Sequence, residues 1–210
     1  MADVRTHFLI CTGGGPGAME AGHLGAALGS AGDATVNAAL EKLKDYAVVP
    51  ELGKMVDAEG HVDTALAAQA YAWFKPAYEL AQSIAAPCES LAIPTWHYGH
   101  EPPTPFATHI AKYFQNSVRE DGLVTIAQQG IICTPGKAGT LQEIFQDGVQ
   151  NAYLVSGTFS PMVLFGVEYW TRTFPVVDVL KQLFGENYDR YVLLTDDEAT
   201  STQFIEQFAS

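Results

Sequence analysis

The chain has 210 residues, 48% of them hydrophobic, which suits one large domain with a sizeable core and excludes a disordered protein. Its formal net charge is −13, so we expect neither DNA nor RNA as a partner, because nucleic-acid binders present basic surfaces. No apolar run approaches the roughly 20 residues of a membrane span, and the N-terminus does not resemble a signal peptide. We therefore predict no membrane association and a cytoplasmic location.

The three cysteines, Cys11, Cys88 and Cys133, are far apart and odd in number. Neither a disulfide framework nor a metal site has such a spacing. We predict that all three are buried, reduced thiols.

Short apolar runs alternate with helical patterns along the chain. Strands are predicted over residues 7–12, 91–96, 130–134, 162–165 and 191–195. Continuously apolar strands separated by helices are typical of a parallel sheet that is covered on both faces. The sequence therefore predicts an α/β fold with a doubly wound parallel sheet, in a single nucleotide-binding domain over residues 1–210.

An alanine-rich segment over about 31–90 interrupts this alternation and predicts a helical insertion, which could also be an oligomer surface. Its two helices are expected over 36–47 and 63–85, with Pro76 bending or ending the second. A further helix is predicted over 106–122, because five apolar residues there share a helical stripe. These are Phe106, Ile110, Tyr113, Phe114 and Val118.

Two glycine-rich turns, at 13–22 and 134–143, each follow a predicted strand and lead into a helix. Small residues let backbone amides approach an anion there, and the helix dipole adds positive charge at the same point. If both turns lie at the carboxyl ends of parallel strands, they meet where doubly wound folds bind ligands. The alternative is that both are only tight turns between a strand and a helix.

Two residues near these turns allow a structural and a functional interpretation. Thr140 and Glu143 have the spacing of a capping box, in which Thr140 would cap the helix and Glu143 would return to its first amide. Alternatively, Glu143 faces a bound ribose phosphate. Arg119 is either a surface residue neutralised by Glu120 and Asp121, or a functional residue whose guanidinium binds phosphate or orients a carboxylate.

A cluster of possible metal ligands occurs within and after a proline-rich turn. It comprises His97, His100, Glu101 and His109. Because this segment is not a helix face with ligand spacing, we expect hydrogen bonding rather than a metal site.

The segments GGGPGAMEA at 13–21 and P-G-x-x-G-T-x-x-E at 135–143 resemble the LOG family of phosphoribohydrolases. The resemblance extends over about 7–195 and is most specific over 97–153, where it is closest to the larger bacterial branch. It implies a Rossmann-like fold, a homodimer or higher homo-oligomer, and no cofactor. It also implies hydrolysis of a nucleoside 5′-monophosphate, such as AMP or a cytokinin riboside monophosphate, to the free base and ribose 5-phosphate.

The resemblance places the family's catalytic pair on Arg119 and Glu143. The implied substrate-binding and phosphate-binding residues are Gly14, Gly15, Gly17, Met19, Glu20, Gly136, Lys137, Ala138, Gly139 and Thr140. Gly13 belongs to the same first turn.

Three departures from the family pattern are visible. Lys137 stands where a glycine is common, and we expect its side chain to point to solvent. Glu120 stands where compact members have lysine. The residues before 7–12 are too few for the family's first strand and helix, so the domain is expected to lack that unit. The missing unit favours the alternative function, a non-catalytic nucleotide-binding or sensor protein. The helical segment over 31–90 allows a third function, that of a structural or interaction protein.

Overall fold

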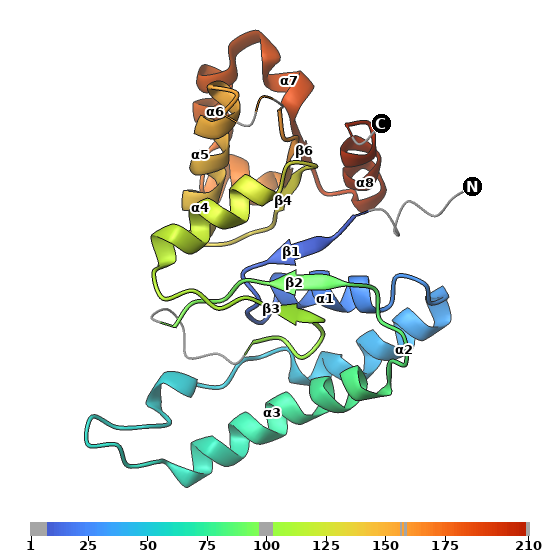
Figure 1. Cartoon of the computed structure of the whole chain (residues 1–210), viewed down its shortest axis with the longest axis vertical. Helices are drawn as coiled ribbons and strands as arrows, with labels where there is room; N and C mark the ends of the chain where they lie inside the picture. Colours follow the sequence, from blue (N-terminus) through green and yellow to red (C-terminus); the bar gives the residue numbers. More distant parts are fainter. Residues whose placement is uncertain (1–7, 97–102, 156, 158, 209–210) are drawn as a thin grey trace. The chain divides into compact units, whose positions relative to one another are not determined.

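The computed structural model of the protein describes residues 8–96, 103–155, 157 and 159–208. The chain forms two compact units, Met1–Arg119 and Glu120–Ser210. Each unit has its own three-stranded sheet (Figure 1). All strand pairs in both sheets are parallel, which requires crossover connections between successive strands.

The sheet of the first unit has the order β1-β2-β3, with β1 (Ile10–Thr12), β2 (Ser90–Ala92) and β3 (His109–Ile110). Ile10 lies opposite Ser90, and Leu91 lies opposite His109. β1 and β2 confirm the first two predicted strands, although both are shorter than expected. Residue 7 lies outside the described residues.

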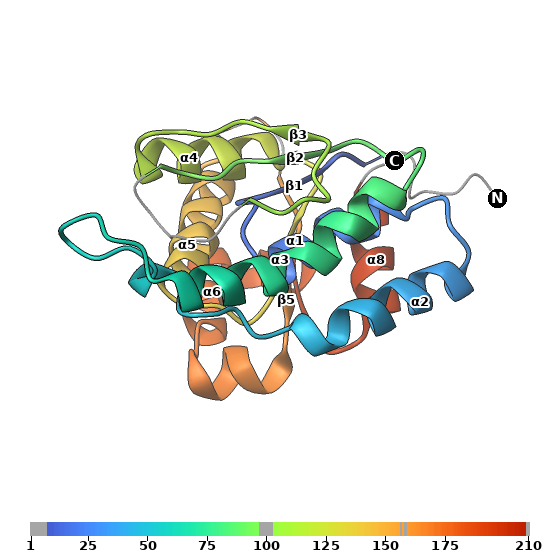
Figure 2. The same ribbon diagram turned by 90° about the horizontal axis from the view of Figure 1, so that it is seen from below.

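Three helices of the first unit lie on the same side of this sheet (Figures 1 and 2). They are α1 (Ala18–Ala27), α2 (Asp33–Leu43) and α3 (Thr64–Ser83). Two 3-10 turns, Lys44–Tyr46 and Leu52–Lys54, connect α2 to α3. The predicted helical insertion is therefore confirmed. The core of this unit contains the buried aromatic ring of Phe106. Buried residues from the helical segments pack around it, namely Leu24, Leu28, Ala39 and Ala77.

Pro76 does not end α3, which continues to Ser83. Proline removes one helical hydrogen bond, but Ala77 and Leu80 beyond it pack into the apolar core of the unit. Asp63 caps the other end, where its carboxylate accepts from the amides of Ala65 and Leu66. Packing and capping together explain why the helix extends through the proline.

The predicted helix over 106–122 is wrong in its first half. β3 occupies His109–Ile110, and α4 (Asn116–Ile126) begins only afterwards. The amides of Ala111 and Tyr113 donate to the carbonyls of Ala92 and Pro94, so this stretch extends the sheet. Its apolar residues are aromatic or β-branched, types that suit strands as well as helices, and pairing with β2 decides between the two.

The second unit has a sheet of order β4-β5-β6, formed by β4 (Ile131–Cys133), β5 (Met162–Phe165) and β6 (Val192–Thr195). All three were predicted strands. The longer helices that follow them are α5 (Ala138–Ala152), α6 (Val177–Phe184) and α8 (Glu198–Glu206). The shorter ones are a π-helical turn (Tyr169–Thr173), a 3-10 turn (Gly185–Asn187) and α7 (Tyr188–Tyr191).

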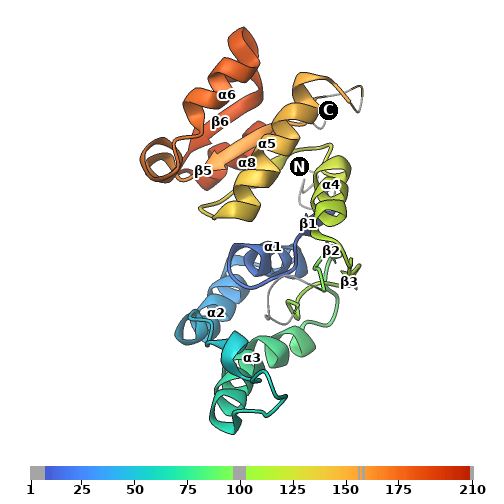
Figure 3. The same cartoon turned by 90° about the vertical axis from the view of Figure 1, so that its left-hand side faces the viewer.

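Figures 1 and 3 show α5 and α6 on one side of the β4-β5-β6 sheet and α8 on the other. The sheet is therefore covered on both faces, as its apolar strands require. Met162, Val163 and Leu164 of β5 are fully buried. The core around them also contains Ile144, Trp170, Leu180 and Phe184.

Parallel strands alternating with helices confirm the predicted α/β, Rossmann-like fold class. Cys11, Cys88 and Cys133 are all free thiols, but only Cys133 is buried as expected, whereas Cys11 and Cys88 are half-buried. Among the described residues, no helix combines the length and the apolar character that crossing a membrane demands.

Candidate functional site

The first glycine turn, Gly13–Gly17, connects β1 to α1. Gly14 and Gly17 have φ of +76° and +82°, a backbone region that side chains rarely adopt. A Cβ added at Gly14 would lie 2.7 Å from the Cβ of Ala92, so β2 approaches too closely for any other residue. A Cβ at Gly13 would lie 2.9 Å from Sδ of Met19, which folds over the turn. The predicted residues Gly14, Gly17 and Met19 are therefore together.

A partly buried chain of hydrogen bonds holds this turn in place. The amide of Gly14 donates to Oγ1 of Thr12 at 2.9 Å, and Nε2 of His23 lies 2.9 Å from the same oxygen. His23 is fully buried, and burial lowers the pKa of its imidazole. Because the neutral ring is favoured, His23 acts as a polar support for Thr12. No motif in the sequence pointed to either residue.

Glu20 lies beside the first turn and is half-buried. Burial raises the pKa of its carboxyl group, whereas a side-chain hydrogen bond to Thr104 lowers it. The amide of Thr104 donates to the carbonyl of Gly14 at 2.8 Å. Glu20 is thus joined to the glycine turn through Thr104, a residue that the sequence did not indicate.

Arg119 lies in the first unit, on the first turn of α4. A Cβ added at Gly13 would lie 3.1 Å from Nη1 of Arg119, so the guanidinium covers the glycine turn. Its Nη2 donates to Oδ1 of Asn116 at 2.8 Å, and the side chain is half-buried. The structure therefore brings Arg119 to the glycine turn of its own unit.

The second glycine turn connects β4 to α5 in the second unit. A Cβ added at Gly136 would lie 2.1 Å from Oγ1 of Thr140, so no larger residue fits beneath that hydroxyl. The hydroxyl of Tyr169 donates to the carbonyl of Gly136 at 2.7 Å and fixes the peptide. Ala138 and Gly139, the first two residues of α5, are exposed, which leaves their backbone accessible.

Lys137 occupies the N-cap position of α5 with φ of −106°. This φ is negative, so the position does not need the positive φ that favours glycine, and lysine can replace the glycine that is common in the family pattern. Lys137 is exposed, in agreement with the expected direction toward solvent.

The capping-box interpretation of Thr140 and Glu143 is wrong. α5 begins at Ala138 with Lys137 as its N-cap, so Thr140 is the third residue inside the helix. The N-cap residue, Lys137, makes no side-chain capping hydrogen bond. Glu143 lies a full turn further along, beyond the reach of the N-cap amide. Its carboxylate is therefore not explained by helix capping.

Glu143 is a half-buried residue of α5. Burial raises the pKa of the Cys133 thiol well above its usual range, and the charges of Glu143 and Asp147 raise it further. Cys133 is the last residue of β4. Both carboxyl groups thus lie near the carboxyl end of a parallel strand, where α/β folds bind ligands.

Asp147 is a buried carboxyl group that the sequence did not single out. Asp147 is 1% exposed. Burial raises its pKa to about 7, although a hydrogen bond from Asn151 acts in the opposite direction and lowers the pKa. Nδ2 of Asn151 donates to Oδ2 of Asp147 at 2.8 Å and to the carbonyl of Ser160 at 3.0 Å. This network ties α5 to the segment before β5.

Glu120 and Asp121 have different surroundings, although they are neighbours on α4. Glu120 is 1% exposed, and a Cβ added at Gly139 would lie 3.9 Å from its Oε1. Its carboxyl group therefore lies by the first turn of α5, where the helix dipole favours negative charge. Asp121 accepts a hydrogen bond from Gln146 at 2.7 Å and so connects α4 to α5.

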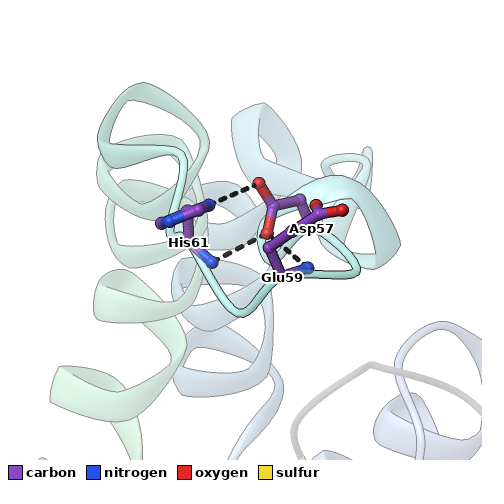
Figure 4. A group of neighbouring side chains, drawn as sticks. All are labelled: Asp57, Glu59 and His61. Atoms are coloured by element: carbon purple, nitrogen blue, oxygen red, sulfur yellow. Dashed lines mark hydrogen bonds and ion pairs between the residues drawn. The ribbon is translucent and has the colours of Figure 1, made fainter.

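Asp57, Glu59 and His61 form a compact group on the loop before α3, with ligand atoms within 4.8 Å of one another (Figure 4). Oδ1 of Asp57 accepts from the amides of Glu59 and His61, and Oδ2 lies 3.1 Å from Nδ1 of His61. All three residues are exposed. Closure of the loop around Asp57 accounts for the group without an ion.

The metal cluster considered in the sequence falls mostly outside the described residues, which exclude His97, His100 and Glu101. His109 is described, and its Nε2 lies 3.5 Å from an oxygen of Glu89 on the exposed surface.

Comparison of the chain with models of known protein families gives no match. Comparison with curated proteins gives no match either. Membership of the LOG family, implied by the glycine turns, Arg119 and Glu143, therefore stays a prediction.

Proposed function

We propose that the protein hydrolyses the N-glycosidic bond of a nucleoside 5′-monophosphate, either AMP or a cytokinin riboside monophosphate. The products would be the free base and ribose 5-phosphate. The observation that carries this proposal is the position of Glu143, a half-buried carboxylate next to the end of β4 that plays no part in capping α5.

Such a position suits a catalytic carboxylate. Partial burial removes some water from around the carboxylate, so its charge acts more strongly on a nearby positive charge. Glu143 also follows an anion-binding type of turn, whose peptide Tyr169 fixes at Gly136. The ribose of such a substrate, with its polar hydroxyl groups and reactive anomeric carbon, would use both features.

The reaction needs a group that stabilises positive charge at the anomeric carbon. Loss of a nucleobase passes through an oxocarbenium-like state, as in glycoside hydrolysis. The carboxylate of Glu143 would stabilise this charge and polarise a water molecule. The water oxygen bonds to the anomeric carbon, the carbon–nitrogen bond breaks, and one water proton goes to the departing base. This chemistry requires no metal or organic cofactor.

The first unit supplies a second anion-binding feature. The guanidinium of Arg119 covers Gly13, and the braced Gly14 holds the turn in one conformation. Arginine recognises phosphate through two parallel hydrogen bonds. We assign Arg119 to holding the substrate phosphate at this turn.

The test is a screen of AMP, N6-substituted AMP, GMP, CMP and UMP for released base by chromatography. Glu143→Gln should abolish base release but leave AMP binding within about threefold, because the shape is kept and the charge is lost. Glu168→Gln is the matched control, since Glu168 is an exposed glutamate of the same unit, 80% open at its side chain. It should leave the turnover unchanged.

An unchanged turnover of Glu143→Gln would refute the catalytic role. AMP binding without any base release from the wild-type protein would instead indicate the alternative function, a nucleotide-binding or sensor protein. Assembly as a homodimer or higher oligomer is part of the same proposal and is tested by light scattering.

A further inference from the structure

An aromatic pair lies at the carboxyl end of the first unit's sheet. The rings of Trp96 and Phe114 are stacked, with centroids 6.0 Å apart and planes inclined by 22°. Nζ of Lys112 lies 4.1 Å from the centroid of the Trp96 ring, in cation–π contact. None of these residues has a place in the glycine turns or the catalytic pair.

The register of the sheet explains why the two rings meet. Thr95 and Tyr113 form a parallel bridge, and the amide of Trp96 donates to the carbonyl of Tyr113 at 2.9 Å. Trp96 and Phe114 are the next residues on their respective strands, so they project to the same side. Backbone pairing therefore holds the two rings together.

The surface of this pair is largely open to solvent. Trp96 is 57% exposed in spite of its contacts with Phe114 and Lys112, and Phe114 is 68% exposed. Lys112 and the stacked neighbour restrict the indole to one orientation. An exposed but oriented aromatic ring is the feature that proteins use to stack nucleobases.

The pair also lies close to the first glycine turn. A Cβ added at Gly14 would lie 3.5 Å from Cδ of Pro94, and Trp96 is two residues further, at most about 7 Å along an extended chain. On the other strand, α4 begins two residues after Phe114 and brings Arg119 to Gly13. Both connections join the aromatic pair to the same turn.

We propose that Trp96, with Lys112 and Phe114 fixing its ring, forms the nucleobase subsite for a nucleotide whose phosphate binds at the Gly13–Gly17 turn. This inference rests on the proposed function, because it assigns the base of that substrate. The planar ring of a purine would stack on the indole, while the ribose extends toward the turn. The subsite recognises the π-face of the base, so purines should bind more tightly than pyrimidines.

Binding of AMP and of ribose 5-phosphate, which lacks the base, separates the subsite from the phosphate site. Both ligands are measured by calorimetry on full-length protein in the Glu143→Gln background, which prevents turnover. Trp96→Ala should weaken AMP binding about tenfold and leave ribose 5-phosphate within twofold. Trp96→Phe keeps a ring and should stay within about threefold for AMP.

Tyr71→Ala is the matched control. Tyr71 is 66% exposed on α3 and also has a lysine, Lys75, over its ring, but it is far in sequence from both strands that carry the aromatic pair. It should bind AMP as the parent does. As a second readout, AMP should quench the tryptophan fluorescence of the Trp73→Phe variant, and ribose 5-phosphate should not. That quenching should disappear in Trp96→Phe.

Equal weakening of AMP and ribose 5-phosphate in Trp96→Ala would overturn the inference, and so would no weakening of either. Failure of the unsubstituted protein to bind AMP would overturn it as well. AMP binding that quenches Trp96 without base release by wild-type protein would contradict the proposed function alone and support the subsite.

Discussion

Replacing Asp147 by asparagine should remove a pH-dependent loss of stability from the second unit. Asp147 is 1% exposed, and burial raises its pKa to about 7, from 3.8 in an unstructured chain. Asparagine has nearly the same shape, and its side-chain carbonyl can accept the hydrogen bond that Asn151 donates to Oδ2. The substitution therefore changes charge while keeping the network.

The direction in which stability changes with pH follows from how many protons the folded and unfolded states bind. Between about pH 4 and pH 7, the folded protein holds a proton on Asp147 that the unfolded chain has already released. The free energy of unfolding therefore falls as the pH rises through this window and levels off above it. The difference of about three pKa units corresponds to at most about 4 kcal/mol at 1.36 kcal/mol per unit.

The assay is urea denaturation of wild type and Asp147→Asn from pH 4.5 to 8.5. Trp170, fully buried in the core of the second unit, reports unfolding in a background with Trp73 and Trp96 replaced by phenylalanine. The variant should match the wild type near pH 4.5 and exceed it by about 2–4 kcal/mol at pH 8.5. A stability difference that stays constant with pH would refute the reasoning, as would a carboxyl NMR titration of Asp147 with a midpoint near pH 4.

Two further predictions concern the turns. Arg119→Lys should lower base release at least about tenfold, because an ammonium cannot contact Asn116 and cover Gly13 together as the guanidinium does; activity within twofold of wild type would contradict this. Gly136→Ala should destabilise the second unit by about 1–3 kcal/mol through its clash with Thr140, as measured by denaturation. The control Gly122→Ala, in the interior of α4 with open space around it, should stabilise by about 0.5–1 kcal/mol, and equal effects of the two substitutions would refute the steric argument.

The glycine turns could be predicted because their requirements are local. Gly14 and Gly17 need positive φ within one short turn, and Gly136 must accommodate a side chain only four residues away. The same holds for the strands of the second unit, where runs such as Met162–Phe165 are apolar throughout and match the observed bounds. The conformation of these turns and the bounds of these strands therefore depend mainly on neighbouring residues in the sequence.

The errors arise where distant residues decide the structure. Residues 109–113 have a helical apolar period, but Ala92 and Pro94, nearly twenty positions earlier, supply the carbonyls that make the segment extended. Likewise, the spacing of Thr140 and Glu143 fits a capping box, yet α5 starts three residues earlier than that box requires. In both cases the sequence contains the local pattern, but contacts elsewhere in the fold stabilise a different backbone arrangement.

The polar residues that the sequence analysis missed share one property, which is that their partners lie across the fold. Thr104 binds Gly14 from ninety residues away, and His23 reaches Thr12 from the next helix. Asp147 is polar by type, and only its burial against the sheet of the second unit raises its pKa. A motif can therefore locate an anion-binding turn, but the groups that brace the turn and shift protonation near it follow from packing. Substitutions at these supporting residues should alter the conformation of the turns or their pH dependence rather than remove a ligand contact.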